Sequence, residues 1–320
     1  MRSMELIRYA SIPLELNGKA GDEVMILADS RTEPGVYESF AAAAFGMGMS
    51  PNVILMAARA AHGHEPTRVA ARGMLDADLL LSVASTAMTH TDAVRAALGE
   101  GVRYVSMPGI TVDMMTNGAA TADYREVSRV SEAVAHILTQ GQELHLTCAH
   151  GSDLTLGISG RRAFPLDGKY RPGAVAAFPD GEVAMAVMEG TSRGRVIFDL
   201  TMHMLGRLNE PVVLTVKDGR AVKIEGGRQA ERLSEIFATQ GDENSNNIGE
   251  FAVGTNAWAR AIGNASEDKK RIGTVHIGLG DNCTLSGRVR SATHLDGIMA
   301  APTLTVDGRT IIDAGKLMID

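Results

Sequence analysis

Short apolar runs alternate with alanine-rich segments through the first 140 residues. Four runs have few polar interruptions, as strands do when both faces of a parallel sheet are covered; they are Glu23–Ala28, Pro51–Met56, Asp78–Val83 and Val102–Met107. Threonine or proline opens the alanine-rich segments, which predicts helices over 33–48, 67–75 and 91–98. A longer amphipathic segment, 123–140, is expected to close a wound α/β domain over residues 1–140.

The pattern changes to strand-sized repeats near residue 141. Strands are predicted at Gln142–Thr147, Asp153–Ile158, Glu182–Val187, Arg195–Asp199, Val212–Val216, Ala221–Glu225 and within Thr303–Ile312. Asp-Gly pairs at 218–219 and 307–308 indicate hairpin turns. Helices are expected over 228–239 and 256–262. The predicted fold class is α/β, with an N-terminal wound parallel-sheet domain (1–140) and a C-terminal β-rich α+β domain (141–320).

Candidate metal ligands lie between Gly273 and Gly297. The segment Thr274–Leu279 reads as a strand, and His294 and Asp296 share a face if their backbone is extended. Together with His276 they offer two imidazoles and one carboxylate, a set that holds a divalent transition metal and leaves positions open for substrate. The alternative is a turn in which Asp296 orients His294, with His276 as an ordinary hydrogen-bonded histidine. Spacing alone leaves both interpretations open.

Other titratable residues are weaker candidates. Glu182 and Glu250 each follow a glycine and precede an apolar run, so both are candidates for a site, whereas Glu250 also suits the start of a helix as a dipole partner. His203 lies among apolar residues and is either a core histidine or an acid/base group. His90 follows the third predicted strand, where α/β sheets place their sites, but it also suits the start of a helix.

Composition narrows the function classes. The net charge is −7 and no basic cluster interleaves with aromatic residues, so a nucleic-acid or membrane partner has little support. Neither a G-x-G-x-x-G nor a G-x-x-x-x-G-K motif occurs, which argues against a nucleotide site. Cys148 and Cys283 form no disulfide framework, and no long apolar run occurs. We therefore expect a soluble cytoplasmic protein, and the glycine-rich, edge-forming sheet domain favours a homo-oligomer.

Five motifs occur in the order seen in the aminopeptidase T superfamily. They are G-S-D-L-T-L-G-I-S-G-R at 151–161, P-D-G-E-V at 179–183, G-E-F-A-V-G-T-N at 249–256, D-K-K-R-I-G-T-V-H-I-G-L-G at 268–280 and H-L-D-G at 294–297. The resemblance implies a metal-bearing C-terminal domain. It places Glu182, Glu250, His276, His294 and Asp296 on the ligand positions of peptidases that bind two metal ions such as Zn, Co or Mn. The tyrosine that those peptidases carry after the histidine-bearing strand is missing from residues 281–286.

The chain resembles most the 2,5-dihydroxypyridine 5,6-dioxygenase branch of that superfamily. The G-L-G-D-N sequence after His276, the shorter length, and the E-P, T-H-T and P-G-I-T stretches of the N-terminal half are similar. This resemblance implies one Fe(II) held by His276, His294 and Asp296, with His90 and His203 as acid/base groups. The implied reaction opens a small hydroxylated pyridine with O₂ to give N-formylmaleamate; a metalloaminopeptidase is the alternative.

Overall fold

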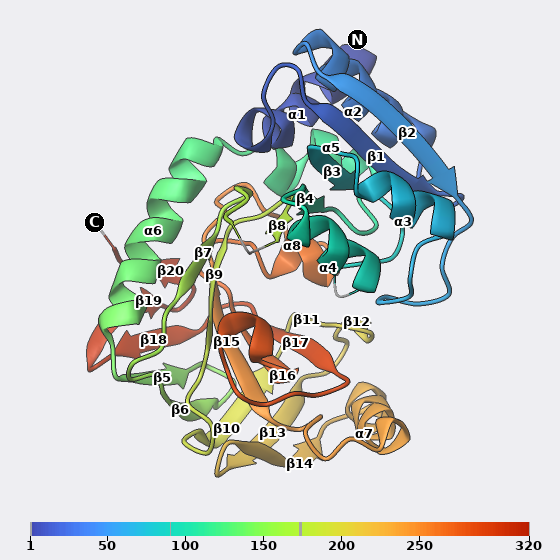
Figure 1. Ribbon diagram of the computed structural model, residues 1–320. Helices are drawn as coiled ribbons and strands as arrows, with labels where there is room; N and C mark the ends of the chain where they lie inside the picture. The colour runs from blue at the N-terminus through green and yellow to red at the C-terminus, as the bar shows by residue number, and fades with distance from the viewer. Residues whose placement is uncertain (1, 90, 173–174, 320) are drawn as a thin grey trace. The chain divides into compact units, whose positions relative to one another are not determined.

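The computed structural model describes residues 2–89, 91–172 and 175–319, and the chain divides into two compact units (Figure 1). The first unit comprises Met1–Tyr124 and Asp167–Asp180, and the second comprises Arg125–Leu166 and Gly181–Asp320. This division differs from the predicted one at residue 140. Residues 125–140, which form nearly all of the helix over 124–140, are grouped with the second unit, and the later segment 167–180 returns to the first.

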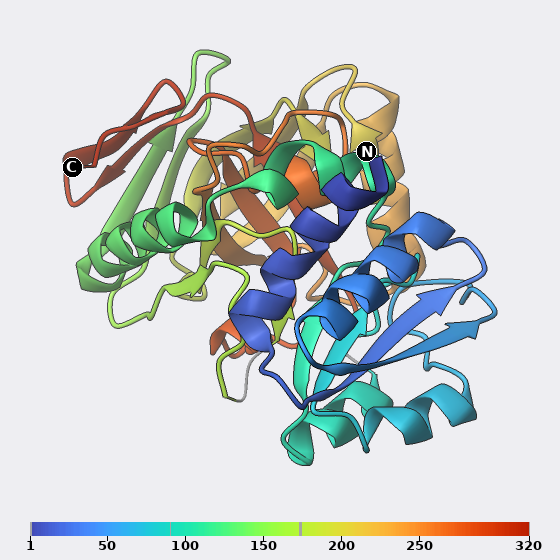
Figure 2. The same ribbon diagram turned by 90° about the horizontal axis from the view of Figure 1, so that it is seen from above.

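The first unit contains a five-stranded parallel sheet in the order β2-β1-β3-β4-β8. Its strands are β1 (Glu23–Asp29), β2 (Ser50–Met56), β3 (Leu79–Ser82), β4 (Arg103–Ser106) and β8 (Ala176–Ala177). Its helices are α1 (Arg2–Asn17), α2 (Pro34–Gly46), α3 (Arg68–Met74), α4 (Asp92–Gly99), α5 (Val112–Thr116) and the 3-10 turn η1 (Gly118–Thr121). Figure 2 shows α1 and α2 on one face of this sheet and α3 and α4 on the other, which confirms the predicted wound parallel-sheet architecture.

Local sequence signals explain where these helices begin. The hydroxyl groups of Thr67, Thr91 and Thr111 accept hydrogen bonds from backbone N–H groups in the first turns of α3, α4 and α5. Each hydroxyl thereby satisfies a donor that has no partner within its helix. Pro34 occupies the first turn of α2, where its missing N–H costs no hydrogen bond. No helix among the described residues is long and apolar enough to span a bilayer.

Two antiparallel sheets form the second unit. The eight-stranded sheet has the order β14-β13-β10-β6-β5-β18-β19-β20, and the seven-stranded sheet has the order β12-β11-β17-β16-β15-β9-β7. The first sheet contains β5 (Glu143–Thr147), β6 (Asp153–Gly157), β10 (Arg193–Phe198), β13 (Val212–Lys217), β14 (Arg220–Glu225), β18 (Thr303–Val306), β19 (Arg309–Asp313) and β20 (Lys316–Leu317). The second contains β7 (Phe164–Leu166), β9 (Glu182–Ala186), β11 (Thr201–Met202), β12 (Gly206–Arg207), β15 (Ile248–Gly254), β16 (Val275–Gly280) and β17 (His294–Met299).

A continuous apolar core joins the two sheets and the amphipathic helix α6 (Tyr124–Gln140). Val130, Val134 and Leu138 of α6 belong to this core. Phe198 of β10 lies directly against Gly297 of β17, where any side chain larger than hydrogen would meet the aromatic ring at 2.5 Å. Both predicted Asp-Gly hairpins are confirmed, with positive φ angles at both residues of each pair.

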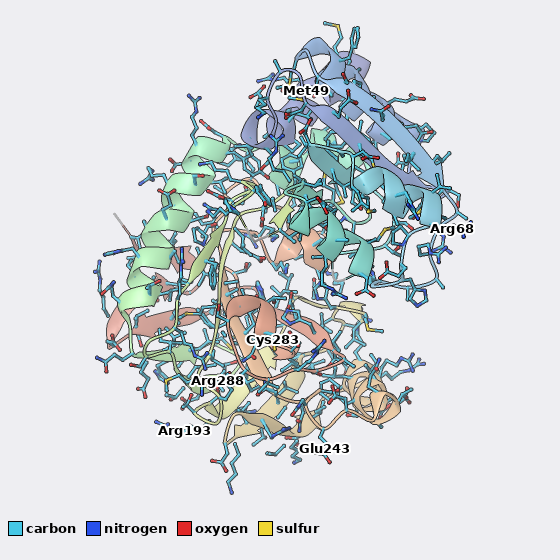
Figure 3. All side chains as sticks on the ribbon, in the orientation of Figure 1. Met49, Arg68, Arg193, Glu243, Cys283 and Arg288 are labelled. Atoms are coloured by element: carbon cyan, nitrogen blue, oxygen red, sulfur yellow. The ribbon has the colours of Figure 1, made fainter. Side chains whose placement is uncertain are left out.

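The remaining helices of the second unit are α7 (Arg228–Gln240), α8 (Ala265–Asp268) and the 3-10 turn η2 (Cys283–Leu285). The helix predicted over 256–262 is wrong, because these residues form turns and the next helix begins at Ala265. The side chain of Asn256 accepts a hydrogen bond from the backbone N–H of Trp258 at 2.9 Å, and such a local contact competes with helix formation. Cys283, labelled in Figure 3, is exposed and free, and Cys148 is also free.

Candidate metal centre

The two faces of the seven-stranded sheet have opposite chemistry. Because alternate strand residues share a face, one face carries a set of apolar residues that lie in the core: Val183, Met185, Phe251, Val253, Val275, Ile277, Leu279, Leu295 and Met299. The other face carries the predicted ligands Glu182, Glu250, His276, His294 and Asp296. Small residues stand between them at Ala184, Ala186, Ala252, Gly254, Gly278 and Gly280. The side chains of the ligands therefore have room to meet.

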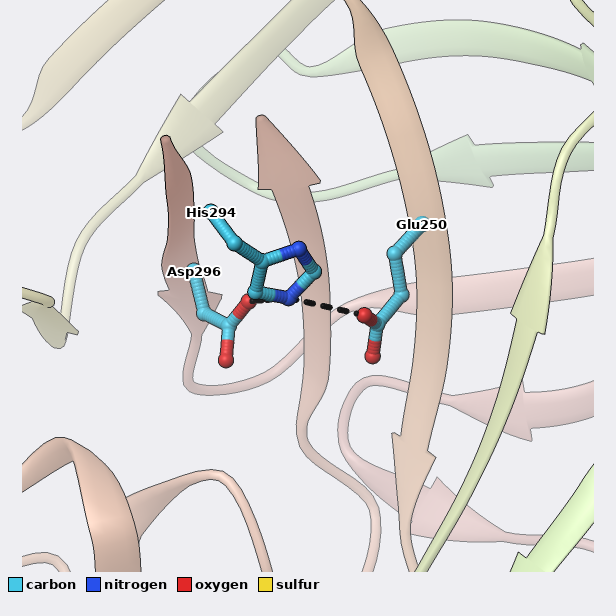
Figure 4. A group of neighbouring side chains, drawn as sticks. All are labelled: Glu250, His294 and Asp296. Carbon is cyan, nitrogen blue, oxygen red and sulfur yellow. Dashed lines mark ion pairs between the residues drawn. The ribbon is translucent and has the colours of Figure 1, made fainter. Parts of the chain in front are cut away.

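Glu250, His294 and Asp296 form the tightest group (Figure 4). His294 Nε2 lies 2.9 Å from Glu250 Oε2 and 3.2 Å from Asp296 Oδ1. The other ring nitrogen, Nδ1, is 2.9 Å from the backbone carbonyl oxygen of Asp281. Because a carbonyl only accepts hydrogen bonds, Nδ1 carries a proton there, which directs the Nε2 lone pair toward the carboxylates.

His276 joins the group from β16, the central strand of this cluster. Its Nε2 atom lies 3.2 Å from Glu250 Oε1, 3.8 Å from Glu182 Oε2 and 3.9 Å from Asp296 Oδ2. The structure thus brings all five predicted ligands together from four adjacent strands. Two alternatives from the sequence are wrong: His294 and Asp296 lie in strand β17 and not in a turn, and Glu250 lies in strand β15 and not at a helix start.

Two lysines that were not predicted complete the cluster. Lys269 Nζ lies 2.9 Å from Asp296 Oδ2 and 3.5 Å from Glu182 Oε1, and Lys270 Nζ lies 2.7 Å from Glu182 Oε1. Lysine is seldom buried, so residue type alone does not place Lys269 and Lys270 in the site. The one sequence signal that connects these lysines with the site is that the D-K-K-R run lies directly before the glycine-rich strand that carries His276.

Mutual charge keeps the carboxylates ionised. Burial raises the pKa of the Glu182 and Asp296 carboxyls, but the Lys269 ammonium and the other positive groups around them together outweigh it, so both pKa values lie below the usual range. Burial also raises the pKa of Glu250, but the charge on His294 and the hydrogen bonds from His276 and His294 together lower it by more. In turn, Asp296 and Glu250 raise the pKa of His294 well above its usual value despite burial. A proton and a metal ion would therefore compete for the lone pair of His294 Nε2.

His203 reaches the same cluster from the turn after β11. Its Nδ1 atom lies 3.5 Å from Asp296 Oδ2 and accepts a hydrogen bond from the Asp296 backbone N–H at 3.3 Å. The backbone N–H of His203 donates to the Asp296 carbonyl at 3.0 Å. An accepting Nδ1 atom belongs to a neutral ring protonated at Nε2. Burial lowers the pKa of His203, which favours the same neutral form. His90, the other predicted acid/base residue, lies outside the described residues.

The residues present fit a divalent metal ion. Among the described residues, Glu182 Oε2 and Asp296 Oδ1 are buried oxygens that receive no hydrogen bond. Buried polar atoms normally have a partner, and two carboxylate oxygens aimed into a cluster with imidazole nitrogens are a suitable ligand set for a transition metal. Gly278 provides the space, because a Cβ atom there would lie 2.8 Å from Glu250 Cβ, 3.1 Å from His294 Cε1 and 3.2 Å from Asp296 Oδ1.

Comparisons with known proteins agree with this picture. A sequence model of the 2,5-dihydroxypyridine 5,6-dioxygenase (NicX) family matches residues 13–319. The structure of 2,5-dihydroxypyridine dioxygenase from Pseudomonas putida KT2440 is similar with a TM-score of 0.83 at 18% identity, covering 99% of this chain and 98% of that chain. AmpT from Thermus thermophilus is similar with a TM-score of 0.70 at 15% identity, covering 100% of both chains. A sequence search of curated proteins gave no match. These likenesses confirm the predicted fold class and superfamily.

Replacing Gly278 by alanine tests whether the space among these ligands is needed for metal. The new Cβ would displace Glu250, His294 or Asp296, and we expect the affinity for Mn²⁺ or Zn²⁺ to fall by roughly 10- to 100-fold, as when groups that orient ligands are changed. Isothermal titration calorimetry measures the change. Gly99→Ala, in open space at the end of α4, is the control and should bind as the unmodified chain does. Unchanged affinity in a folded Gly278→Ala variant would contradict this reading.

Proposed function

The chain belongs to the 2,5-dihydroxypyridine 5,6-dioxygenase family, and from that premise we propose that it is an Fe(II)-dependent ring-cleaving dioxygenase. The proposed substrate is 2,5-dihydroxypyridine or a similar hydroxylated N-heteroaromatic. The bond between ring carbons 5 and 6 would break, and both atoms of O₂ would enter the product, N-formylmaleamate. The observation that carries the proposal is the group of imidazole and carboxylate ligands on one face of β15, β16 and β17, in a chain that matches this family over nearly its whole length.

His276, His294 and Asp296 are the proposed iron ligands, and Glu250 lies close enough to join or support them. A bound Fe(II) would supply a Lewis acid for the substrate hydroxyl group and a redox-active ion for O₂. The chain's own contribution is to hold the ligands in place. The Asp281 carbonyl fixes the ring of His294, and Lys269 fixes one oxygen of Asp296.

His203 is the proposed proton carrier beside the metal ligands. Its Nδ1 atom accepts the Asp296 backbone N–H, so the ring's own proton is on Nε2. This tautomer makes His203 a donor, able to hold a hydrogen bond to a substrate oxygen and to protonate it as charge develops. His90 remains a second proposed acid/base residue on the resemblance alone.

A metal-dependent aminopeptidase is the second candidate. The fold is shared with AmpT, and Glu182 and Glu250, which the sequence resemblance assigns to metal-ligand positions of peptidases, both lie beside His276 Nε2. The family match and the absence of a tyrosine in 281–286 favour the dioxygenase. A cytoplasmic location and a homo-oligomeric state stay predictions from the sequence.

Metal and oxygen dependence separate the two candidates. Protein reconstituted with Fe²⁺ under reducing, anaerobic conditions and then exposed to 2,5-dihydroxypyridine should consume one O₂ per pyridine, because both oxygen atoms enter the product. Zn²⁺ should inhibit, since it has no redox chemistry. An oxygen electrode and chromatography of the product measure both. The dioxygenase proposal fails if Zn²⁺-loaded protein removes N-terminal residues from peptides without oxygen while the iron form leaves the pyridine intact.

The His203→Gln variant tests the proton carrier. It should retain iron, because His203 contacts a ligand but is not proposed as one, and its turnover should fall by roughly 10²- to 10⁴-fold. Steady-state oxygen uptake and iron content are the two measurements. His145→Gln is the matched control, since His145 also pairs with a carboxylate, Asp153, at 2.8 Å but both side chains are exposed. Full turnover in His203→Gln would remove His203 from the mechanism.

A further inference from the structure

Lys269 lies where the carboxylates of the cluster would be expected to hold a second cation. The two carboxylate oxygens of Asp296 have different partners: Oδ1 faces His294 Nε2 at 3.2 Å, and Oδ2 faces Lys269 Nζ at 2.9 Å. Lys269 Nζ also lies 3.5 Å from Glu182 Oε1. The ammonium group therefore bridges two carboxylates through Asp296 Oδ2, the oxygen that does not face His294 Nε2.

The lysine is held there by the backbone and not only by its charge. Lys269 follows directly after the short helix α8, and its N–H donates to the carbonyl of Ala265 at 3.3 Å. The buried carboxylate of Asp268 accepts hydrogen bonds from the N–H groups of Ile262 and Gly263 and from the Thr201 hydroxyl. The side chain of Lys269 is only 17% exposed. Its ammonium group is thus a fixed part of the site.

The net charge of the cluster bears on how many divalent ions it can hold. Glu182, Glu250 and Asp296 bring three negative charges, and Lys269 and Lys270 bring two positive ones. One divalent ion with neutral imidazole ligands leaves the group with a net charge of only +1. A second divalent ion would leave an excess of positive charge where Asp296 is fully buried and Glu182 is 3% exposed, and buried unbalanced charge is costly.

We propose that the ammonium group of Lys269 occupies the place of a second metal ion between Glu182 and Asp296 and limits the centre to one divalent cation. Metal sites that hold two ions place them about 3.5–4 Å apart on shared ligands. Lysine offers a single positive charge with hydrogen-bond donors in that place, and it provides no open coordination position for a water nucleophile. The inference rests on the proposed metal centre, but not on the reaction that the centre carries out.

Metal stoichiometry in charge-altered variants tests the inference. Apo protein is dialysed anaerobically against saturating Mn²⁺, and bound metal is measured by elemental analysis, with EPR to detect an exchange-coupled pair of ions. The unmodified chain should bind one Mn²⁺. Lys269→Met, which keeps the length of the side chain and removes its charge, should bind two and show the coupled signal. Lys269→Arg retains the charge and should bind one.

Lys223→Met is the matched control, because Lys223 also pairs with a carboxylate, Glu225 at 2.7 Å, but is exposed in the same unit. It should bind one Mn²⁺. Two ions bound to the unmodified chain would overturn the inference without any variant, as would a folded Lys269→Met variant that still binds one. These outcomes are independent of the dioxygenase assay: one bound ion without oxygen uptake would reject the proposed function and leave the role of Lys269 standing.

Discussion

The register between β15, β16 and β17 is the constraint on which the site depends. Gly278 pairs with Glu250 on one side and with Asp296 on the other, which places these two carboxylates across a residue that has no side chain. A slip of one residue in a strand moves its side chains to the opposite face. It would drive Glu250 or Asp296 into the apolar core and leave Phe251 or Leu295 outside it. Burial of the apolar face therefore fixes the ligand geometry on the other face.

Charge compensation is the second condition for this arrangement. Three ionised carboxylates on a buried sheet face would repel one another strongly, and the imidazole and lysine side chains are what make their proximity tolerable. Lys269 and Lys270 come from the segment between α8 and β16, so the fold of that segment is tied to the electrostatics of the site. The same groups hold the carboxylates in position for a metal ion without reorganisation.

The sequence predicted the parts of this structure that depend on short-range patterns. Continuous apolar runs predicted the parallel sheet, and the i, i+2 spacing of His294 and Asp296 predicted that they share a face. The pairing of β9 with β15 joins Glu182 to Gly254 across some seventy residues, and no local pattern encodes such a contact, so Glu182 and Glu250 were placed with the metal ligands only by resemblance.

Other features were not predicted because contacts in the folded chain override the usual preference of the residues concerned. Lys269 and Lys270 are buried by partners that lie far away in the sequence, whereas most lysines are exposed. Strand β8 consists of two residues and joins the first sheet from beyond residue 170, next to β4. The stretch after Asn256 has helical composition, but the asparagine side chain bonds to Trp258 N–H and favours a turn.

We propose that one iron ion, held by residues on the face of β15, β16 and β17, is the reactive centre of this enzyme. Anomalous X-ray scattering at the iron absorption edge, from crystals loaded with Fe²⁺ without oxygen, tests it most directly. We expect a single peak per chain within bonding distance of His294 Nε2 and of an Asp296 carboxylate oxygen. A peak at another place, or two peaks that share Asp296 as a bridging ligand, would contradict it.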